Sequence, residues 1–290
     1  ALAMREAGVK KPILVMAVGS KAEIVELARH NVTTTVWGDD ASATLRSAAA
    51  KLGRPIPVEL LVDTGMNREG MPFARASSWI EELVRADHVA VEGTYTMFAH
   101  DLDFDRVQLQ RFMQIRTWAA ERGLALGRLH AAPTIELFHY PESHLDMVRP
   151  GNALFGNYPS GEGAREMADL RTVYRLCCRV VRVERVEPGS FAGFYRTFEP
   201  ERPTWVALLP TGRTDGYPSG TQGKGEVLIN GRLFPVVGGV NSAHAIIEIG
   251  EGILLLQQFS IFVPGTAVHL AATDVGNGKD KSPVQQGKAV

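Results

Sequence analysis

The sequence has little cysteine and no cysteine pattern of a metal site or a disulfide scaffold. Its only two cysteines, Cys177 and Cys178, are adjacent within an apolar, strand-like run. Neighbouring side chains of a strand point to opposite faces, so these two thiols are not expected to form a disulfide with each other. Such cysteine usage favours a reducing, cytoplasmic location, and no Cys/His spacing predicts a bound metal.

The sequence also lacks an excess of charge and any long apolar run. Its formal net charge is −1, so no overall field attracts nucleic acid or an anionic membrane. No apolar segment approaches the length that crosses a bilayer. Charges interrupt residues 1–8, which are not expected to be a signal peptide and look like the end of a helix closed by Gly8.

What the sequence does contain is the composition of a globular protein, with 290 residues, 45% of them hydrophobic and 22% charged. As far as about residue 160, apolar runs alternate with amphipathic helical patterns. Strands are expected at 12–18, 33–37, 57–63, 89–99, 128–131 and 145–148, and helices at 20–30, 40–52, 73–86, 105–122 and 134–139. This alternation predicts a parallel sheet with crossover helices, either doubly wound or closed as a barrel. Because a (β/α)₈ barrel needs eight strands, either the sheet is open or two strands precede this chain.

The pattern changes after the loop at 158–163. Short β-rich runs follow at 172–187, 204–210, 225–229, 232–237, 244–248, 253–257 and 266–271, with a hairpin signal at Asn230-Gly231. They predict a separate, mainly antiparallel β domain. We therefore expect a (β/α) barrel domain at 1–160, a C-terminal β domain at 161–275 and a disordered tail at 276–290.

Four segments follow one another in the order of a known family pattern. They are VDTGMNREG at 62–70, TMFA at 96–99, HAAPT at 130–134 and DMVRPGNALFG at 146–156. With TDGYP at 214–218 and GEVLING at 225–231, they closely resemble the alanine racemase family of pyridoxal 5′-phosphate (PLP) enzymes, from residue 1 to about 274. The resemblance implies a (β/α)₈ barrel lacking its first two strands in this chain, followed by a mainly antiparallel β domain.

The resemblance also implies a cofactor-binding side. Arg149 matches the arginine that faces the PLP ring nitrogen. Since arginine stays protonated, it leaves that nitrogen unprotonated, which favours proton exchange at Cα over decarboxylation or transamination. Gly151 and Asn152 match the family's phosphate contacts, and Thr134 replaces its serine while keeping a hydroxyl donor.

Three further residues near these motifs have two readings each. Arg68 matches an arginine near the cofactor's phenolic oxygen and the substrate carboxylate, although it could instead pair with Asp63 or Glu69. His100 follows the TMFA segment and is expected to be structural or solvent-facing rather than catalytic. His130 matches the family's histidine and is expected to pack rather than to bind a ligand.

Both catalytic bases of the family are missing from their expected contexts. The Schiff-base lysine belongs to a KAxAYGHG run on the first barrel strand; this sequence has no such run, and Lys10, Lys11 and Lys21 lie in other contexts. The catalytic tyrosine belongs to a GYxDG motif, which here reads GRTDG with Arg213 in its place. Arginine cannot serve as a general base near neutral pH, and Tyr217 lies four residues further on.

Other substrate-side positions differ from the family too. Met97 replaces a histidine, and Leu61 replaces a lysine that positions the barrel arginine. The family's CMD segment, which reaches the substrate carboxylate from the partner subunit, reads Asn241-Ser242-Ala243 here. The cofactor side is thus largely kept while the substrate side is changed.

The leading hypothesis is a PLP-dependent amino-acid racemase, acting on a small amino acid within a head-to-tail homodimer. Without the lysine and the tyrosine, the chain is not expected to racemise alanine by the two-base route. One alternative is a one-base PLP enzyme in which a segment preceding this chain supplies the lysine and Arg213 holds a larger or acidic amino acid. The other is a non-catalytic racemase-like paralogue or fragment that binds a ligand or a partner protein.

Overall fold

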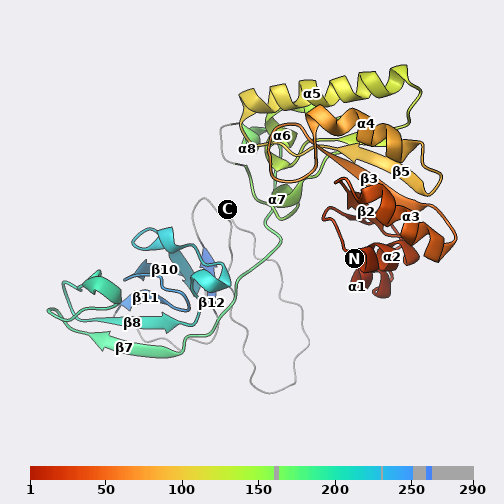
Figure 1. The fold of residues 1–290 in the computed structure, drawn as a ribbon. Coiled ribbons are helices and arrows are strands. Elements are labelled where there is room, and N and C mark those ends of the chain that lie inside the picture. Colours follow the sequence, from red (N-terminus) through yellow and green to blue (C-terminus); the bar gives the residue numbers. More distant parts are fainter. Residues whose placement is uncertain (160–162, 230, 251–258, 263–290) are drawn as a thin grey trace. The chain divides into compact units, whose positions relative to one another are not determined.

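The computed structural model describes residues 1–159, 163–229, 231–250 and 259–262 (Figure 1). These form two compact units, the first made of residues 1–154 and 158–170 and the second of residues 155–157 and the described residues from 171 onward. The strands expected at 253–257 and 266–271 and the tail expected at 276–290 lie outside the described residues.

The first unit contains the predicted parallel sheet. Its strands run in the order β1-β2-β3-β5-β6, and a parallel bridge between His130 and Met147 adds the sixth predicted strand to the β6 edge. Their bounds are β1 (Leu14–Val15), β2 (Thr33–Val36), β3 (Ile56–Asp63), β5 (Val89–Tyr95) and β6 (Arg128–His130), and β4 (Met71–Pro72) pairs with the end of β3. This parallel sheet is the corresponding part of an α/β barrel.

The predicted helices of this unit all form, with bounds displaced by at most three residues. They are α1 (Leu2–Glu6), α2 (Lys21–Arg29), α3 (Ala41–Leu52), α4 (Phe73–Val84), α5 (Leu102–Glu121), α6 (Thr134–His139), α7 (Gly151–Leu154) and α8 (Ala164–Met167), with a 3₁₀ turn η1 (Pro141–Ser143). The largest displacement is at the start of α5, where the Asp101 carboxylate accepts hydrogen bonds from the backbone N–H groups of Asp103 and Phe104. That cap lets the helix begin before its apolar pattern does.

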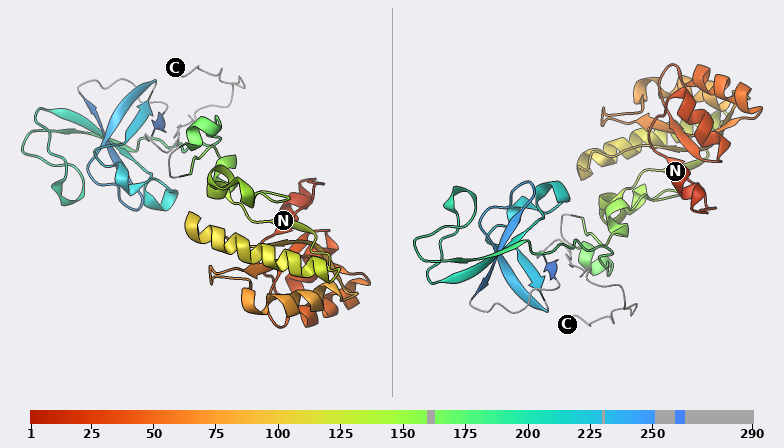
Figure 2. Two further views of the ribbon diagram at one scale, coloured as in Figure 1. Left: turned by 90° about the horizontal axis from the view of Figure 1, so that it is seen from above. Right: turned by 90° about the horizontal axis from the view of Figure 1, so that it is seen from below.

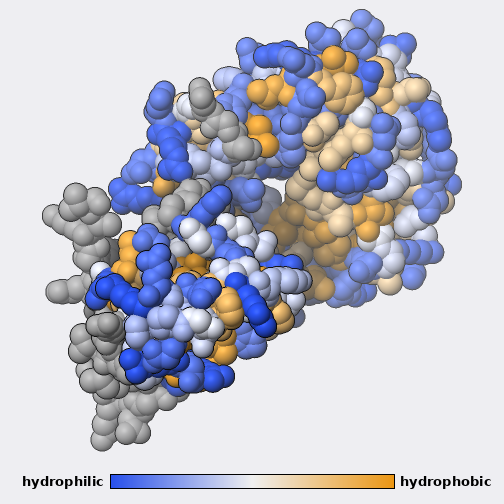
Figure 3. Space-filling view, turned by 90° about the vertical axis from the view of Figure 1, so that its left-hand side faces the viewer, coloured by the Kyte–Doolittle hydropathy of each residue, from blue (hydrophilic) through white to orange (hydrophobic). Residues whose placement is uncertain are grey.

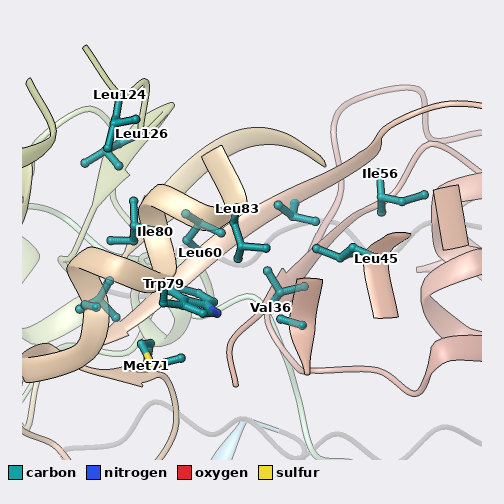
Figure 4. Packing of buried hydrophobic residues seen from close by; sticks show 14 of the residues in the cluster. Val36, Leu45, Ile56, Leu60, Met71, Trp79, Ile80, Leu83, Leu124 and Leu126 are labelled. Atoms are coloured by element: carbon teal, nitrogen blue, oxygen red, sulfur yellow. The ribbon is translucent and has the colours of Figure 1, made fainter. Parts of the chain in front are cut away.

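One face of the sheet packs against the helices and forms the main core. Val58, Leu60 and Val62 of β3 belong to this core together with Ile80 and Leu83 of α4, which lie beside Leu60 in Figure 4. The side chains between them along β3 point to the opposite face of the strand. The polar residue Glu59 is therefore directed away from the helices, toward the inner face of the sheet.

The second unit is an antiparallel sheet with strand order β12-β9-β10-β11-β8-β7. The bounds are β7 (Arg182–Val186), β8 (Thr204–Leu209), β9 (Glu226–Ile229), β10 (Arg232–Val237), β11 (Ala245–Gly250) and β12 (Phe259–Phe262), with 3₁₀ turns η2 (Phe194–Arg196), η3 (Arg213–Asp215) and η4 (Ser219–Thr221). The predicted hairpin is confirmed by the pairing of Ile229 with Arg232. The run 172–187 forms a strand only at 182–186, where it pairs with residues 204–208 of β8. Figure 2 shows the two units from two further sides.

The surface seen in Figure 3 is mostly hydrophilic, with separate hydrophobic patches. Cys177 is exposed and Cys178 is half-buried. Burial raises the pKa of Cys178 to about 11, which keeps this thiol protonated at neutral pH. Within the described part of the chain, every helix is too short or too polar to cross a membrane.

Packing of α4 on the sheet is expected to dominate the stability of the first unit. Leu83 is fully buried in the core. The substitution Leu83→Ala should therefore lower the free energy of unfolding by about 2–5 kcal/mol, because it removes buried methyl groups and leaves a cavity. Urea unfolding followed by tryptophan fluorescence measures this loss. Val107→Ala, at a partly exposed site on α5, is the matched control, and an equal loss in both variants would contradict the assignment.

Candidate active site

Arg149 is held in one orientation by the ends of the parallel strands. Its Nη2 donates to the carbonyl oxygens of Thr96 and Ala131, each at 2.8 Å, and contacts Sδ of Met97 at 3.3 Å. Its Nη1 donates to Nδ1 of His130. Among the described residues, no acceptor is hydrogen-bonded to Nε, so this N–H, together with the second N–H of Nη1, remains available to a ligand.

His130 links Arg149 to a buried carboxylate. Its Nε2 lies 2.7 Å from Oε2 of Glu59, and both side chains are almost completely buried. Since Nδ1 must accept the hydrogen bond of Arg149, the imidazole proton belongs on Nε2, where Glu59 accepts it. Burial, and secondarily the charge of Arg149, lower the pKa of His130, so the ring stays neutral between a cation and an anion.

The space for Glu59 comes from a glycine on the next strand. A Cβ at Gly93 would lie 2.8 Å from Cδ of Glu59 and 2.9 Å from the carbonyl oxygen of Arg128. Neither contact could be tolerated without a shift of the strands, because a real Cβ does not approach other atoms so closely. Gly93 is therefore required for the Glu59–His130–Arg149 chain of hydrogen bonds.

Tyr95 packs against both other members of this group. Its ring stacks on His130 with centroids 4.7 Å apart, and the guanidinium carbon of Arg149 lies 5.1 Å from its centroid. Burial raises the pKa of Tyr95 to about 12, and its hydroxyl lies 2.9 Å from Oγ1 of Thr35. The tyrosine is thus a neutral wall of the site. Burial lowers the pKa of Arg149 to about 10, so the guanidinium still carries its charge at neutral pH.

The predicted phosphate-binding residues lie at the start of two short helices. Thr134 begins α6, and its hydroxyl accepts a hydrogen bond of 3.3 Å from the backbone N–H of Ala153 in α7. Gly151 and Asn152 begin α7 and are exposed, with nothing near the position that a Gly151 Cβ would occupy. The N–H of Gly151 donates to the carbonyl oxygen of Arg149. Thr134 and α7 are thus brought together, as the phosphate hypothesis requires.

Three polar residues of the first unit that lie near the family motifs have local partners. Arg68 is exposed and forms a 3.0 Å ion pair with Glu69, which is one of its two expected alternatives. Asp63 instead accepts from the backbone N–H of Gly65 at 2.8 Å. His100 is half-exposed and lies 3.0 Å from Glu136, in keeping with the structural or solvent-facing reading.

The changed positions of the second unit lie side by side, although 29 residues separate them in the sequence. Arg213 is exposed, and its Nη2 lies 3.4 Å from Oγ of Ser242. The Asn241 side chain caps its own turn, since Oδ1 accepts from the N–H groups of Ala243 and His244 at 2.9 and 2.7 Å. Tyr217 is only 1% exposed within the core of this unit, so it does not offer the hydroxyl that is missing at Arg213.

The sequence did not reveal Glu59 or Gly93 as members of the site. Glu59 interrupts a strand that is otherwise apolar over residues 56–62, and this was the one available signal. A charged residue inside a buried strand requires a partner. Its partner, His130, is 71 residues away, so the sequence alone could not identify it. Among the described residues, no cluster of His, Cys, Asp and Glu could hold a metal ion.

Glu59 is expected to stabilise the Nε2–H tautomer of His130 that the hydrogen bond from Arg149 requires. Glu59→Leu should change the environment of Nε2 and destabilise the first unit by about 1–3 kcal/mol, since the buried Nε2–H donor loses its acceptor. Glu59→Gln keeps an acceptor oxygen and should keep the tautomer. The measurement is ¹⁵N NMR of histidine-labelled protein, in which wild-type His130 should also remain neutral as the pH falls below 6.5. Glu26→Leu, at an exposed carboxylate beside His30, is the control, and an unchanged His130 spectrum in Glu59→Leu would refute the assignment.

Comparison with known proteins identifies the relatives of this arrangement. The family model of the alanine racemase N-terminal domain matches residues 1–159, and that of the C-terminal domain matches residues 173–279. The alanine racemase of Desulforamulus reducens is 34% identical over 253 residues, covering 86% of this chain and 68% of the relative. That of Carboxydothermus hydrogenoformans is 31% identical with the same coverage. Among solved structures, alanine racemase from Streptomyces coelicolor A3(2) superposes with a TM-score of 0.80 at 26% identity, covering 92% of this chain and 74% of that one. The chain belongs to the alanine racemase family, whose members are isomerases.

Proposed function

We propose that this chain takes part in PLP-dependent chemistry at Cα of an amino acid, with a substrate side that differs from that of the two-base alanine racemases. The observation that carries the proposal is the environment of Arg149. Both of its Nη atoms are bound by protein groups, while Nε remains as a donor among the described residues. A permanently charged donor held this firmly is suited to face a pyridine nitrogen.

The residues present fit the cofactor. Arg149 would hold the ring nitrogen, and the Thr134 hydroxyl and the exposed start of α7 at Gly151 and Asn152 would hold the phosphate, with the N–H of Gly151 exchanging its bond to the Arg149 carbonyl oxygen for one to the anion. Bound PLP supplies an aldehyde that links to the amino group and a ring that withdraws electrons from Cα. Arg149 stays protonated and donates its hydrogen bond, so it does not give a proton to the ring nitrogen. This restrains electron withdrawal and favours exchange of the Cα proton over loss of the carboxylate.

The substrate side is proposed to bind an anion rather than to move a proton. Arg213 cannot accept a proton near neutral pH, and Tyr217 is buried in the second unit. Arg213 and the Ser242 hydroxyl instead present adjacent donors on an exposed surface, which suits a carboxylate. A head-to-tail homodimer would bring this surface to the barrel unit of a partner. With a lysine of the family type taking and returning the proton on one face, the reaction would be Cα-proton exchange on a larger or acidic amino acid; no lysine of this chain lies in that family context.

A second candidate function is binding without catalysis. Three substrate-side positions favour it: Arg213 cannot act as a base, Asn241 uses its side-chain oxygen to cap its own turn, and Arg68 is paired with Glu69. A racemase-like paralogue of this kind would keep the Arg149 site for PLP or an amino acid, or would bind a partner protein.

Cofactor binding should depend on the guanidinium group of Arg149. Titration of the 290-residue chain with PLP, followed by absorbance and equilibrium dialysis, should give saturable binding that Arg149→Ala weakens by about tenfold or more, because a charge-assisted hydrogen bond is lost. Arg149→Lys keeps the positive charge but lacks the planar set of N–H donors, and this variant should also bind PLP weakly. Arg122→Ala, at the exposed end of α5, should bind as wild type. Intact mass after borohydride should show no added PLP in this chain, which has no KAxAYGHG lysine; equal binding by all variants would refute the assigned site.

Substrate class should be revealed by exchange of the Cα proton in D₂O, with PLP present and L- and D-amino acids compared by NMR. A one-base site in which Arg213 binds the side-chain carboxylate of the substrate predicts faster exchange of aspartate or glutamate than of alanine. Arg213→Ala should remove that preference. Exchange of no amino acid, with PLP still bound, would favour the non-catalytic candidate. Interconversion of L- and D-alanine by this chain would contradict the absence of a two-base route.

A further inference from the structure

Two carboxyl groups are buried beside the candidate active site without a role in it. Asp105 lies in the first turn of α5 and Glu136 in the first turn of α6, and both residues are 0% exposed. Carboxylates are almost never buried completely unless they are paired. Neither forms an ion pair with Lys or Arg among the salt bridges of the described residues. Some other feature must therefore compensate for their burial.

Each carboxyl group has one oxygen that accepts a hydrogen bond and one that does not. Oδ1 of Asp105 accepts from the N–H of Ala99 at 3.1 Å, and Oε1 of Glu136 lies 3.0 Å from Nδ1 of His100. The remaining oxygens, Oδ2 of Asp105 and Oε2 of Glu136, are buried and meet no donor within the described residues. Ala99 and His100 are adjacent in the chain, so the two carboxyl groups lie against the same short stretch of the loop. A proton between them would satisfy both oxygens at once.

We propose that Asp105 and Glu136 share one proton and so form a proton-binding site that fastens the loop 97–101 to α5 and α6. With the proton bound, one carboxyl donates to the other and the pair carries a single negative charge. Release of the proton to solvent leaves two carboxylates facing each other without a donor. Their repulsion in a buried place then opens the loop.

The loop held by this pair reaches the active site. Gln108 of α5 accepts from the N–H of Ala99 at 2.9 Å and donates to the carbonyl oxygen of Met97 at 3.0 Å. Met97 in turn contacts Nη2 of Arg149 through its sulfur. Opening of the loop would therefore disturb the side of Arg149 that Thr96 and Met97 support, so that the proton on the pair is linked to the orientation of the guanidinium.

The charged groups around the pair do not remove the repulsion. His100 faces Glu136 from the loop, but its side chain is 46% exposed, so solvent screens its charge. Arg149 acts on Glu136 only through the field between them, and Arg106 is exposed and paired with Asp103. Tyr140 borders the pair beyond α6 and carries no charge at neutral pH, since burial raises its pKa. No cation of the described residues therefore replaces the shared proton.

The direction of the pH effect follows from the protonated form. Burial, and then the neighbouring Glu136, raise the pKa of Asp105 from 3.8 to about 6. The pair thus stabilises the folded state fully below pH 3.8, and this stabilisation is lost as the pH rises through about 6. The pKa of Asp105 in the folded chain, about 6, exceeds its ordinary value of 3.8 by about two. The equilibrium constant for opening of the loop should therefore increase by roughly a hundredfold when the proton is lost.

Amide variants provide the test, because an amide donates permanently. In Asp105→Asn the new N–H₂ can donate to Glu136 while the amide oxygen still accepts from Ala99; Glu136→Gln is the reciprocal variant. The probe is hydrogen exchange of the Ala99 amide in the full chain between pH 4 and 8, corrected for the intrinsic rate. The wild type should lose roughly a hundredfold of protection across this range, and both variants should lose almost none. Asp103→Asn, with a 95% exposed side chain two residues away, should behave as wild type.

Two hydrogen-exchange results would overturn the proposal. One is a pH profile of Asp105→Asn and Glu136→Gln that parallels the wild type, which would mean that the pair does not hold the titrating proton. The other is protection at pH 8 that magnesium, calcium or sodium ions restore in the wild type and a chelator or desalting removes, since the pair would then bind a cation. A ¹³C NMR titration of the two carboxyl carbons supports the proposal if they titrate together and refutes it if both behave as isolated, exposed groups.

Discussion

The inner face of the first unit is organised around the charge of Arg149. A guanidinium taken out of water is costly unless its donors are satisfied and its charge is offset. Two carbonyl oxygens at strand ends accept hydrogen bonds from Nη2. His130 accepts one from Nη1 and donates its own proton to the negatively charged Glu59. Because these partners come from β3, β5 and β6 and the segments that follow them, the geometry of the guanidinium is set by the register of the sheet. A shift of any one strand would leave a buried polar group without its partner.

The same principle distinguishes the two sides of the candidate site. Around Arg149, polar groups are buried and bind one another, so each position is fixed by its neighbours. On the substrate side, Arg213 and Ser242 are exposed and make one long contact, which leaves them free to bind something else. A family pattern can therefore persist in the first region while it changes in the second, because replacements at an exposed position cost little stability.

Much of this molecule follows from its sequence. The alternation of apolar runs and helical patterns located the parallel strands and the helices between them. The family motifs placed Arg149, Thr134 and the start of α7 in one region. The sequence could not locate the buried polar pairs, because Glu59 and His130, or Asp105 and Glu136, become neighbours only when distant segments fold together. Nor could it show that Tyr217 points into a core, since that depends on how its turn packs.

The contact between residues 212 and 241–243 has a consequence for the history and the engineering of this protein. A Cβ at Gly212 would lie 2.4 Å from the carbonyl oxygen of Asn241, and the next two residues donate their backbone N–H groups to the 241–242 segment. The two segments thus behave as one module with a common backbone. A change accepted in one alters the surroundings of the other, so they are expected to evolve in concert. Anyone transplanting a racemase loop into this scaffold would have to carry both halves across together.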